Sequence, residues 1–282
     1  MKSKFTILLF DNGSLRPEVT LALRVLAKNL SSRLSIPVEA VSLLHSHKID
    51  KINLGGEPAM IIRRRLKLAI ANKERRFICL PLFLGPSLAI TDYLRKLIHE
   101  FVGIYPEIDV RVAPPLAGWN VDMPDIRLVE ILKEHVIREL DKNTLKGPIK
   151  VALLDHGSPI EKLAVLRNCV ADKLRYEFNK KGVEIIACSM ERREGEQFAF
   201  NDPLLETIDL SQDGNRKLGS LVVAMFFLMP GRHAGKGGDV DRILEDLVQR
   251  GNINDYKKSA LIGEHPLIYS ILEERVEQAI SL

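Results

Sequence analysis

The sequence contains a long internal repeat, and this feature constrains its fold more than any other. Asp11-Asn12-Gly13-Ser14 matches Asp155-His156-Gly157-Ser158, so that positions 12 and 156 differ by 144. The register persists downstream in four further matches: Val38-Glu39 with Val183-Glu184, Pro58 with Pro203, Phe83-Leu84 with Phe227-Leu228, and Ile131-Leu132 with Ile271-Leu272. The 282 residues are therefore expected to form two copies of one structural unit, residues 1–144 and 145–282.

Each half alternates short apolar runs with longer amphipathic stretches, a pattern typical of parallel strands joined by crossover helices. Strands are expected near residues 5–10, 37–44, 76–84 and 108–112, and near 149–154, 183–189, 219–229 and 258–262. The predicted fold class is α/β: two tandem βα domains, each a four-stranded parallel sheet with helices on both faces. The flavodoxin-like strand order is expected, in which the first and third strands are neighbours.

Charge and composition exclude several classes of partner. With 41 Lys and Arg against 37 Asp and Glu, the net charge of +4 is too small to indicate nucleic-acid binding. The longest apolar run, residues 221–230, is too short to cross a membrane, and residues 5–10 are too short for a signal core. We therefore expect a cytoplasmic protein without membrane or nucleic-acid partners. The three cysteines, Cys79, Cys169 and Cys188, lie among apolar neighbours and are assigned no redox or metal role.

Two loops of the second half carry one histidine each, at the edge where ligands bind in such sheets. His156 follows the first strand of that half, and His233 follows the third. A neutral imidazole ligates first-row divalent metals and accepts a proton near neutrality. Either histidine alone is more simply a hydrogen-bonded turn residue, but the pair favours a site. The glycine-rich run around Lys236 matches no nucleotide-binding motif, so a phosphate site is disfavoured.

Three short motifs of the second half resemble those of a known family. These are His156-Gly157-Ser158 after a strand, Phe227-Leu228-x-x-Gly231-x-His233 followed by Asp239, and the closing stretch of residues 262–267. They resemble the sirohydrochlorin cobaltochelatases and ferrochelatases, the small class II tetrapyrrole chelatases. The resemblance implies that His156 and His233 are catalytic, bind the incoming metal and help to deprotonate the macrocycle.

The first half departs from this pattern and is expected to be catalytically silent. Asn12 stands where the family has its first histidine, and Ser87-Leu88-Ala89 stands where the second is expected. In two-repeat members of the family the histidine pair lies in the N-terminal half, so its place in residues 145–282 is unusual. The spacing from His233 to Asp239 is also six positions where four are typical.

An acidic tetrapyrrole needs cations around an apolar slot. Gly157, Ser158, Arg232 and Lys236 are the expected tetrapyrrole-binding residues, and Arg232, beside His233, is the strongest candidate. Further candidates are Arg192-Arg193 and Arg63-Arg64-Arg65, although each is more simply a solvated surface cation. Glu191 could add a carboxylate at the same edge, but an exposed loop acid is the simpler interpretation.

The remaining histidines are expected to have no role in chemistry. His45 and His47 share a loop of the first half and are more simply turn residues than a metal entry point. His99, His135 and His265 are expected in helical or helix-start positions without companions.

The resemblance implies an ATP-independent metallochelatase, a lyase that inserts Co²⁺ or Fe²⁺ into sirohydrochlorin in cobalamin or sirohaem biosynthesis. No tightly bound cofactor is expected, because the ion is a substrate. The alternative is a non-catalytic tetrapyrrole or metal carrier derived from a chelatase, and a protoporphyrin ferrochelatase ranks third. Because two fused repeats can form an internal pseudo-dimer, the protein is expected to be a monomer or a weak homodimer.

Overall fold

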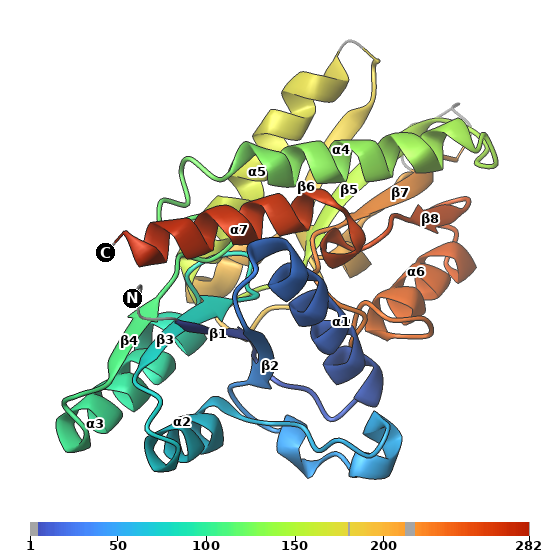
Figure 1. The fold of residues 1–282 in the computed structure, drawn as a ribbon. Coiled ribbons are helices and arrows are strands. Elements are labelled where there is room, and N and C mark those ends of the chain that lie inside the picture. The colour runs from blue at the N-terminus through green and yellow to red at the C-terminus, as the bar shows by residue number, and fades with distance from the viewer. Residues whose placement is uncertain (1–4, 180, 212–217, 282) are drawn as a thin grey trace. The chain divides into compact units, whose positions relative to one another are not determined.

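The computed structural model describes residues 5–179, 181–211 and 218–281, and its ribbon is drawn in Figure 1. This part of the chain contains two four-stranded sheets, in which every strand pair is parallel. The first sheet has the order β2-β1-β3-β4, with β1 Thr6–Asp11, β2 Val38–Ser42, β3 Arg76–Pro81 and β4 Asp109–Val112. The second has the order β6-β5-β7-β8, with β5 Ile149–Asp155, β6 Glu184–Ser189, β7 Ser220–Met225 and β8 Tyr256–Lys258. The predicted fold class and strand order are confirmed.

The connections are longer helices and short helical turns. The α-helices are α1 Pro17–Leu34, α2 Ile62–Ala71, α3 Arg95–Ile104, α4 Ile126–Asp141, α5 Glu161–Asn179, α6 Asp239–Gln249 and α7 Leu267–Ile280. A π-helical turn, η3 Ala89–Leu94, precedes α3. The 3₁₀ turns are η1 Ser46–Lys48, η2 Lys51–Leu54, η4 Glu196–Asn201, η5 Leu205–Thr207 and η6 Ile262–Glu264.

Both faces of the central strands β1, β3, β5 and β7 are largely buried, as is typical of parallel sheets. In the second sheet every residue of β7 is buried, and Leu244 and Leu247 of α6 pack in one cluster with Leu154 and Val223. Helices α4 and α5 contact β7 and β6. In the first sheet α2 and α3 share a cluster with the buried side chains of β1 and β3. The alternate side chains of β1 and β3 are buried as well, so the second face is also covered.

The last helix of each sequence repeat belongs to the compact unit of the other. One unit holds the residues up to Trp119 together with those from Ile268, and the other holds Asn120–Leu267. Helix α7 is held in the first unit, where Arg275 donates hydrogen bonds to the carbonyl oxygens of Pro115 and Leu116. Helix α4 is held in the second unit, where it contacts β7 and α5. The compact units divide after Trp119 and before Ile268, and the boundary between residues 144 and 145 stays a prediction about the sequence repeats.

The eighth strand differs from the expected range. Residues 258–262 were expected, but β8 ends at Lys258 and Ile262 begins the 3₁₀ turn η6. The reason lies in the side chain of Ser259, whose hydroxyl accepts a hydrogen bond from the Met225 N–H at 3.0 Å. The preceding strand also ends at Met225, four residues before the expected end at 229, because the chain then turns into the loop that carries His233.

Candidate active site

Two strand ends bring His156 and His233 together. His156 directly follows β5, and His233 lies in the loop between β7 and α6, two strands that are neighbours in the sheet. The ring centroids are 4.5 Å apart, and the rings meet edge to face at 74°. The side chains are 45% and 31% exposed, so both imidazoles are open to solvent. The two histidines singled out from the sequence therefore form one exposed pair.

The hydrogen bond of His233 fixes which of its nitrogens is free. Nδ1 lies 2.6 Å from Oδ2 of Asp239, and a carboxylate only accepts, so Nδ1 carries the proton. The lone pair is therefore on Nε2. Burial acts to raise the pKa of Asp239, but the hydrogen bond from His233 and the charges of Arg242 and Arg232 hold this pKa below its usual value. Asp239 thus stays ionised and keeps His233 in one tautomer.

His156 is arranged in a similar way. Its Nδ1 lies 3.1 Å from the carbonyl oxygen of Gly157, which can only accept, so Nδ1 is again the donor. The free nitrogen Nε2 is 3.6 Å from Oε1 of Glu191. In the neutral tautomer of each ring, Nε2 is therefore the nitrogen available to a ligand, and a carboxylate lies beside that of His156. Glu191, for which an exposed loop acid was the simpler interpretation, is exposed but adjoins His156.

Gly157 gives the His156 loop its shape. Its φ is +89°, a region that side chains disfavour, and a Cβ built there would lie 1.9 Å from the carbonyl oxygen of Glu191. The loops after β5 and β6 are thus pressed together backbone to backbone. Their hydrogen bonds run from Met190 N–H to Asp155 O and from Glu191 N–H to His156 O.

A cavity of about 700 Å³ adjoins His233. Its lining includes the three arginines Arg192, Arg232 and Arg242 and the acids Glu191, Glu206 and Asp239. The sequence had indicated Arg192 and Arg232. Arg242 was missed because it lies one turn into α6, where an isolated arginine is typical of a helix surface. Its guanidinium forms an ion pair with Asp239.

The other expected ligand residues lie elsewhere in these loops. Lys236 is exposed and does not line the cavity. Ser158 is buried, and its hydroxyl accepts from the Ile160 N–H at 3.1 Å, which organises the start of α5. Among the residues that the structure describes, no group of three or more His, Cys, Asp or Glu could hold a metal ion. The pair is therefore an open two-nitrogen arrangement.

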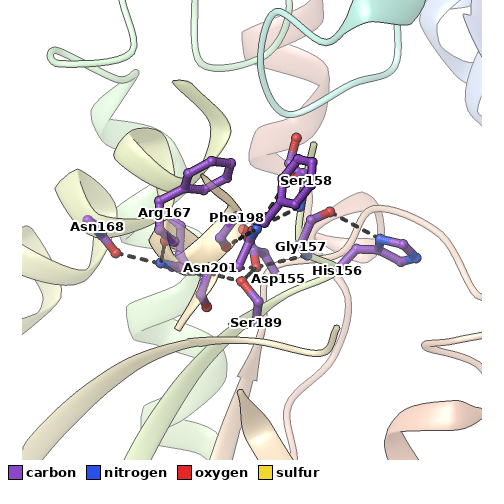
Figure 2. Close-up of polar contacts among 10 residues, drawn as sticks. Asp155, His156, Gly157, Ser158, Arg167, Asn168, Ser189, Phe198 and Asn201 are labelled. Atoms are coloured by element: carbon purple, nitrogen blue, oxygen red, sulfur yellow. Dashed lines mark hydrogen bonds and ion pairs between the residues drawn. The ribbon is translucent and has the colours of Figure 1, made fainter. Parts of the chain in front are cut away.

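A buried polar cluster adjoins the His156 turn, and Figure 2 shows its members. Asp155 accepts hydrogen bonds from the Ser189 hydroxyl at 2.6 Å and from the Gly157 N–H at 3.1 Å. Arg167, on α5, lies 3.5 Å from the same carboxylate oxygen. Burial raises the pKa of Asp155, whereas Arg167 and Ser189 favour its ionised form. Sequence reasoning missed this cluster, since Arg167 lies in a helical pattern that gives no sign of a buried charge.

The first unit has the same loop framework without the imidazoles. Gly13 has a φ of +95°, and a Cβ added there would meet the carbonyl oxygen of Leu44, as one at Gly157 would meet that of Glu191. Leu44 N–H donates to Asn12 O, the counterpart of the bond from Glu191 to His156. Asn12 occupies the first histidine position, and Ala89 begins the π-helical turn at the second. The loop framework is thus duplicated, and the two histidines are not.

Other candidates of the first half are engaged within their own unit. Arg65 pairs with Glu39 and Glu74, and Arg63 pairs with Glu100. His45 is exposed. Among the described residues, neither His45 nor His47 belongs to a group of three or more side chains that could hold a metal ion.

One expectation about the remaining histidines is wrong. His135 and His265 are companions, with ring centroids 5.3 Å apart. His265 Nδ1 accepts from the Leu267 N–H at the start of α7, and its Nε2 bonds to Glu134 on α4 at 3.1 Å. The pairing was missed because 130 positions separate the two residues in the sequence. Both rings are buried and serve the packing of α4.

Comparison with solved structures supports the resemblance. SirB from Bacillus subtilis subspecies spizizenii, in complex with cobalt, is similar with a TM-score of 0.67 and 17% identity, covering 99% of this chain and 96% of that chain. The chain has the fold of a sirohydrochlorin chelatase. SirB from Bacillus subtilis with Fe³⁺ has a TM-score of 0.63 at 18% identity, covering 98% and 95%. CbiX, described as the terminal enzyme for biosynthesis of siroheme in denitrifying bacteria, has a TM-score of 0.53 at 14% identity, covering 98% and 99%.

The likeness is one of fold. No protein-family model matches the sequence, and no curated protein matches it. Within residues 5–179, 181–211 and 218–281, no helix is long and apolar enough to cross a membrane.

Proposed function

We propose that the protein is an ATP-independent metallochelatase that inserts Co²⁺ or Fe²⁺ into sirohydrochlorin. The observation that carries this proposal is the exposed imidazole pair, whose rings are 4.5 Å apart at neighbouring strand ends. The fold shared with SirB, whose structures hold cobalt and Fe³⁺, and with CbiX, an enzyme of siroheme biosynthesis, supports it.

The tautomers of the two histidines suit metal transfer. Each Nε2 offers a lone pair to a divalent ion, and two protein ligands instead of a closed set of four leave the ion free to depart. Insertion breaks two pyrrole N–H bonds and forms bonds from the macrocycle nitrogens to the ion. As the ion leaves, the two vacated Nε2 lone pairs take the two protons and later release them to solvent. Glu191, 3.6 Å from Nε2 of His156, stabilises the protonated ring.

The arginines of the cavity match an acidic macrocycle. Guanidinium groups bind carboxylates through paired hydrogen bonds, and Arg192, Arg232 and Arg242 line the 700 Å³ cavity beside His233. A sirohydrochlorin, which carries many carboxylates, uses such cations better than a protoporphyrin does. We therefore assign Arg232 and Arg192 to the peripheral carboxylates and rank protoporphyrin below sirohydrochlorin.

The second sequence repeat, residues 145–282, then carries the activity, and residues 1–144 form a repeat without a histidine pair. We propose that the protein acts in the cytoplasm as a monomer or a weak homodimer.

The test is the spectral change of sirohydrochlorin mixed with Co²⁺, followed with and without the protein. We expect an accelerated change that His156→Ala and His233→Ala each reduce by about 10²-fold or more. His99→Ala removes an exposed imidazole of the first unit and is the matched control, expected to keep wild-type rates. Binding of sirohydrochlorin or Co²⁺ without acceleration refutes the enzyme and favours the carrier.

A further inference from the structure

Arg167 is a fully buried cation directly beneath the candidate site. It lies on α5 and is 1% exposed. Its guanidinium donates to the Ser189 hydroxyl and to the carbonyl oxygens of Asn201 at 3.2 Å and Phe200 at 3.1 Å. It also lies 3.5 Å from Asp155, the residue that precedes His156. One side chain thus contacts the ends of two strands and the loop beyond them.

These contacts tie together the two loops that flank the imidazole. Asp155, held by Arg167, accepts the Gly157 N–H and so holds the turn that carries His156. On the other side Arg167 holds Asn201, whose side-chain amide bonds the Ser158 N–H at 2.9 Å and the Ser158 carbonyl oxygen at 3.0 Å. Figure 2 shows Arg167, Asp155, Ser189 and Asn201 grouped beside the His156 turn. The same arginine therefore sets both ends of the His156 loop.

The first unit provides an internal comparison in which this arginine is absent. The buried positions of α1 and α5 follow one register, 144 residues apart: Thr20 with Ala164, Leu26 with Val170, Ala27 with Ala171, and Leu30 with Leu174. In that register Leu23, itself buried, corresponds to Arg167. The strand-end pairs are kept, with Asp11 beside Ser42 and Asp155 beside Ser189. The unit without the histidine pair thus retains the aspartate and the serine and has leucine in place of the cation.

The comparison shows what the scaffold requires. Leu23 fills the position with a buried apolar side chain, and Oδ1 of Asp11 has no hydrogen-bond partner among the described residues. A buried ion pair is costly to form and is often no more stabilising than a well-packed apolar side chain. The fold itself therefore does not need a cation at this position. The guanidinium occurs in the unit that has the histidine pair.

We propose that Arg167 is a positioning residue for His156. Through Asp155, Ser189 and Asn201 it fixes the loops after β5 and β6, so that the His156 imidazole stays adjacent to His233 and both Nε2 atoms bind one ion. This inference rests on the proposed function for its biological purpose. Its direct readout, however, is binding of the metal alone, which does not require turnover.

The test is a titration with Co²⁺, followed by the visible absorption of the imidazole-bound ion, on the full-length protein and its variants. Arg167→Leu copies the arrangement of the first unit and is expected to fold. Partners that orient metal ligands typically contribute 10- to 100-fold to metal affinity or activity, so the Kd for Co²⁺ is expected to rise by about 10-fold or more. Arg167→Lys keeps the charge but loses the paired hydrogen-bond geometry, so its Kd for Co²⁺ is expected to lie between those of the wild type and Arg167→Leu.

Arg24→Leu is the matched control. Arg24, on α1, donates to the carbonyl oxygens of Leu54, Glu57 and Pro58, so it tethers a loop of the first unit as Arg167 tethers one of the second. We expect Arg24→Leu to lower the melting temperature and to leave the Kd for Co²⁺ unchanged. A purely structural role of Arg167 would instead lower the melting temperature in both variants without changing Co²⁺ affinity in either.

The outcomes separate the two proposals. An unchanged Kd for Co²⁺ in folded Arg167→Leu overturns the positioning role, whatever the catalytic activity. If the wild type binds Co²⁺ through His156 without accelerating insertion, the chelatase proposal fails, and the effect of Arg167→Leu on the Kd still decides the positioning role. If Arg167→Leu does not fold, Arg167→Lys decides: a folded Lys variant with wild-type Co²⁺ affinity overturns the role, and weakened affinity supports it.

Discussion

Replacement of Gly157 by alanine tests whether the spacing of the two loops controls activity. The added Cβ would lie 1.9 Å from the carbonyl oxygen of Glu191, whereas real Cβ atoms essentially never approach closer than 3.0 Å. The difference, 3.0 minus 1.9, requires the loops to separate by at least 1.1 Å. A displacement of about 1 Å can reduce catalysis by about 10²-fold, and we expect a loss of that order in the sirohydrochlorin assay.

Gly13→Ala is the matched control for this substitution. Its Cβ would lie 1.7 Å from the carbonyl oxygen of Leu44, so the clash and the strained φ are equivalent, but no imidazole is involved. The left-handed conformation costs an alanine about 1–2 kcal/mol in either loop, and both variants should melt a few degrees below the wild type. Only Gly157→Ala should lose activity. Full activity in folded Gly157→Ala, or an equal loss in Gly13→Ala, would refute the reasoning.

Three further predictions concern side chains near and away from the site. Asp239→Asn should weaken Co²⁺ binding by about 10-fold, because an amide does not hold the His233 tautomer. The control Asp246→Asn removes an ion pair on the same helix and should leave Co²⁺ binding unchanged in the same titration. Equal losses of Co²⁺ affinity in both variants would contradict the role of Asp239. Burial raises the pKa of Cys79 to about 12 and also raises that of Cys188, so a thiol reagent at pH 8 should modify neither thiol before denaturation. Rapid labelling of either cysteine in the native protein would contradict this prediction. Desolvation lowers the pKa of His135 below its ordinary 6.5, so the unfolded chain binds more protons than the folded protein and stability falls as the pH drops below about 6.5. His135→Gln should therefore flatten the decline of melting temperature between pH 7 and 5. An unchanged slope in this variant would refute the prediction.

The strands and the histidine pair could be predicted because their signals are local. Short apolar runs mark the eight strands, although β7 ends four residues before its expected end and β8 overlaps its expected range only at Lys258, and the strand order follows from the size of each βα repeat. His156 directly follows one of these strands and His233 lies in the loop after a neighbouring strand, so the topology alone brings them to one edge of the sheet.

The features that were missed depend on contacts between distant residues. Arg167 reads as one polar residue in an amphipathic helix, and only the fold shows that it faces Asp155. Arg242 forms an ion pair with Asp239 only because both lie on the first turn of α6, and the sequence did not place the start of that helix. The bond from His265 to Glu134 joins segments 131 positions apart. None of these is encoded by spacing within a short window.

The exchange of the last helices makes each half of the chain depend on the other. Helix α4 is encoded before the second repeat begins, yet it contacts β7, the strand that leads into the His233 loop. A chain of residues 145–282 alone would lack α4, which contacts β7. It would also lack the residues of the first unit, in which α7 is held. Neither sequence repeat therefore contains every helix of one compact unit, and a single repeat is not expected to fold alone.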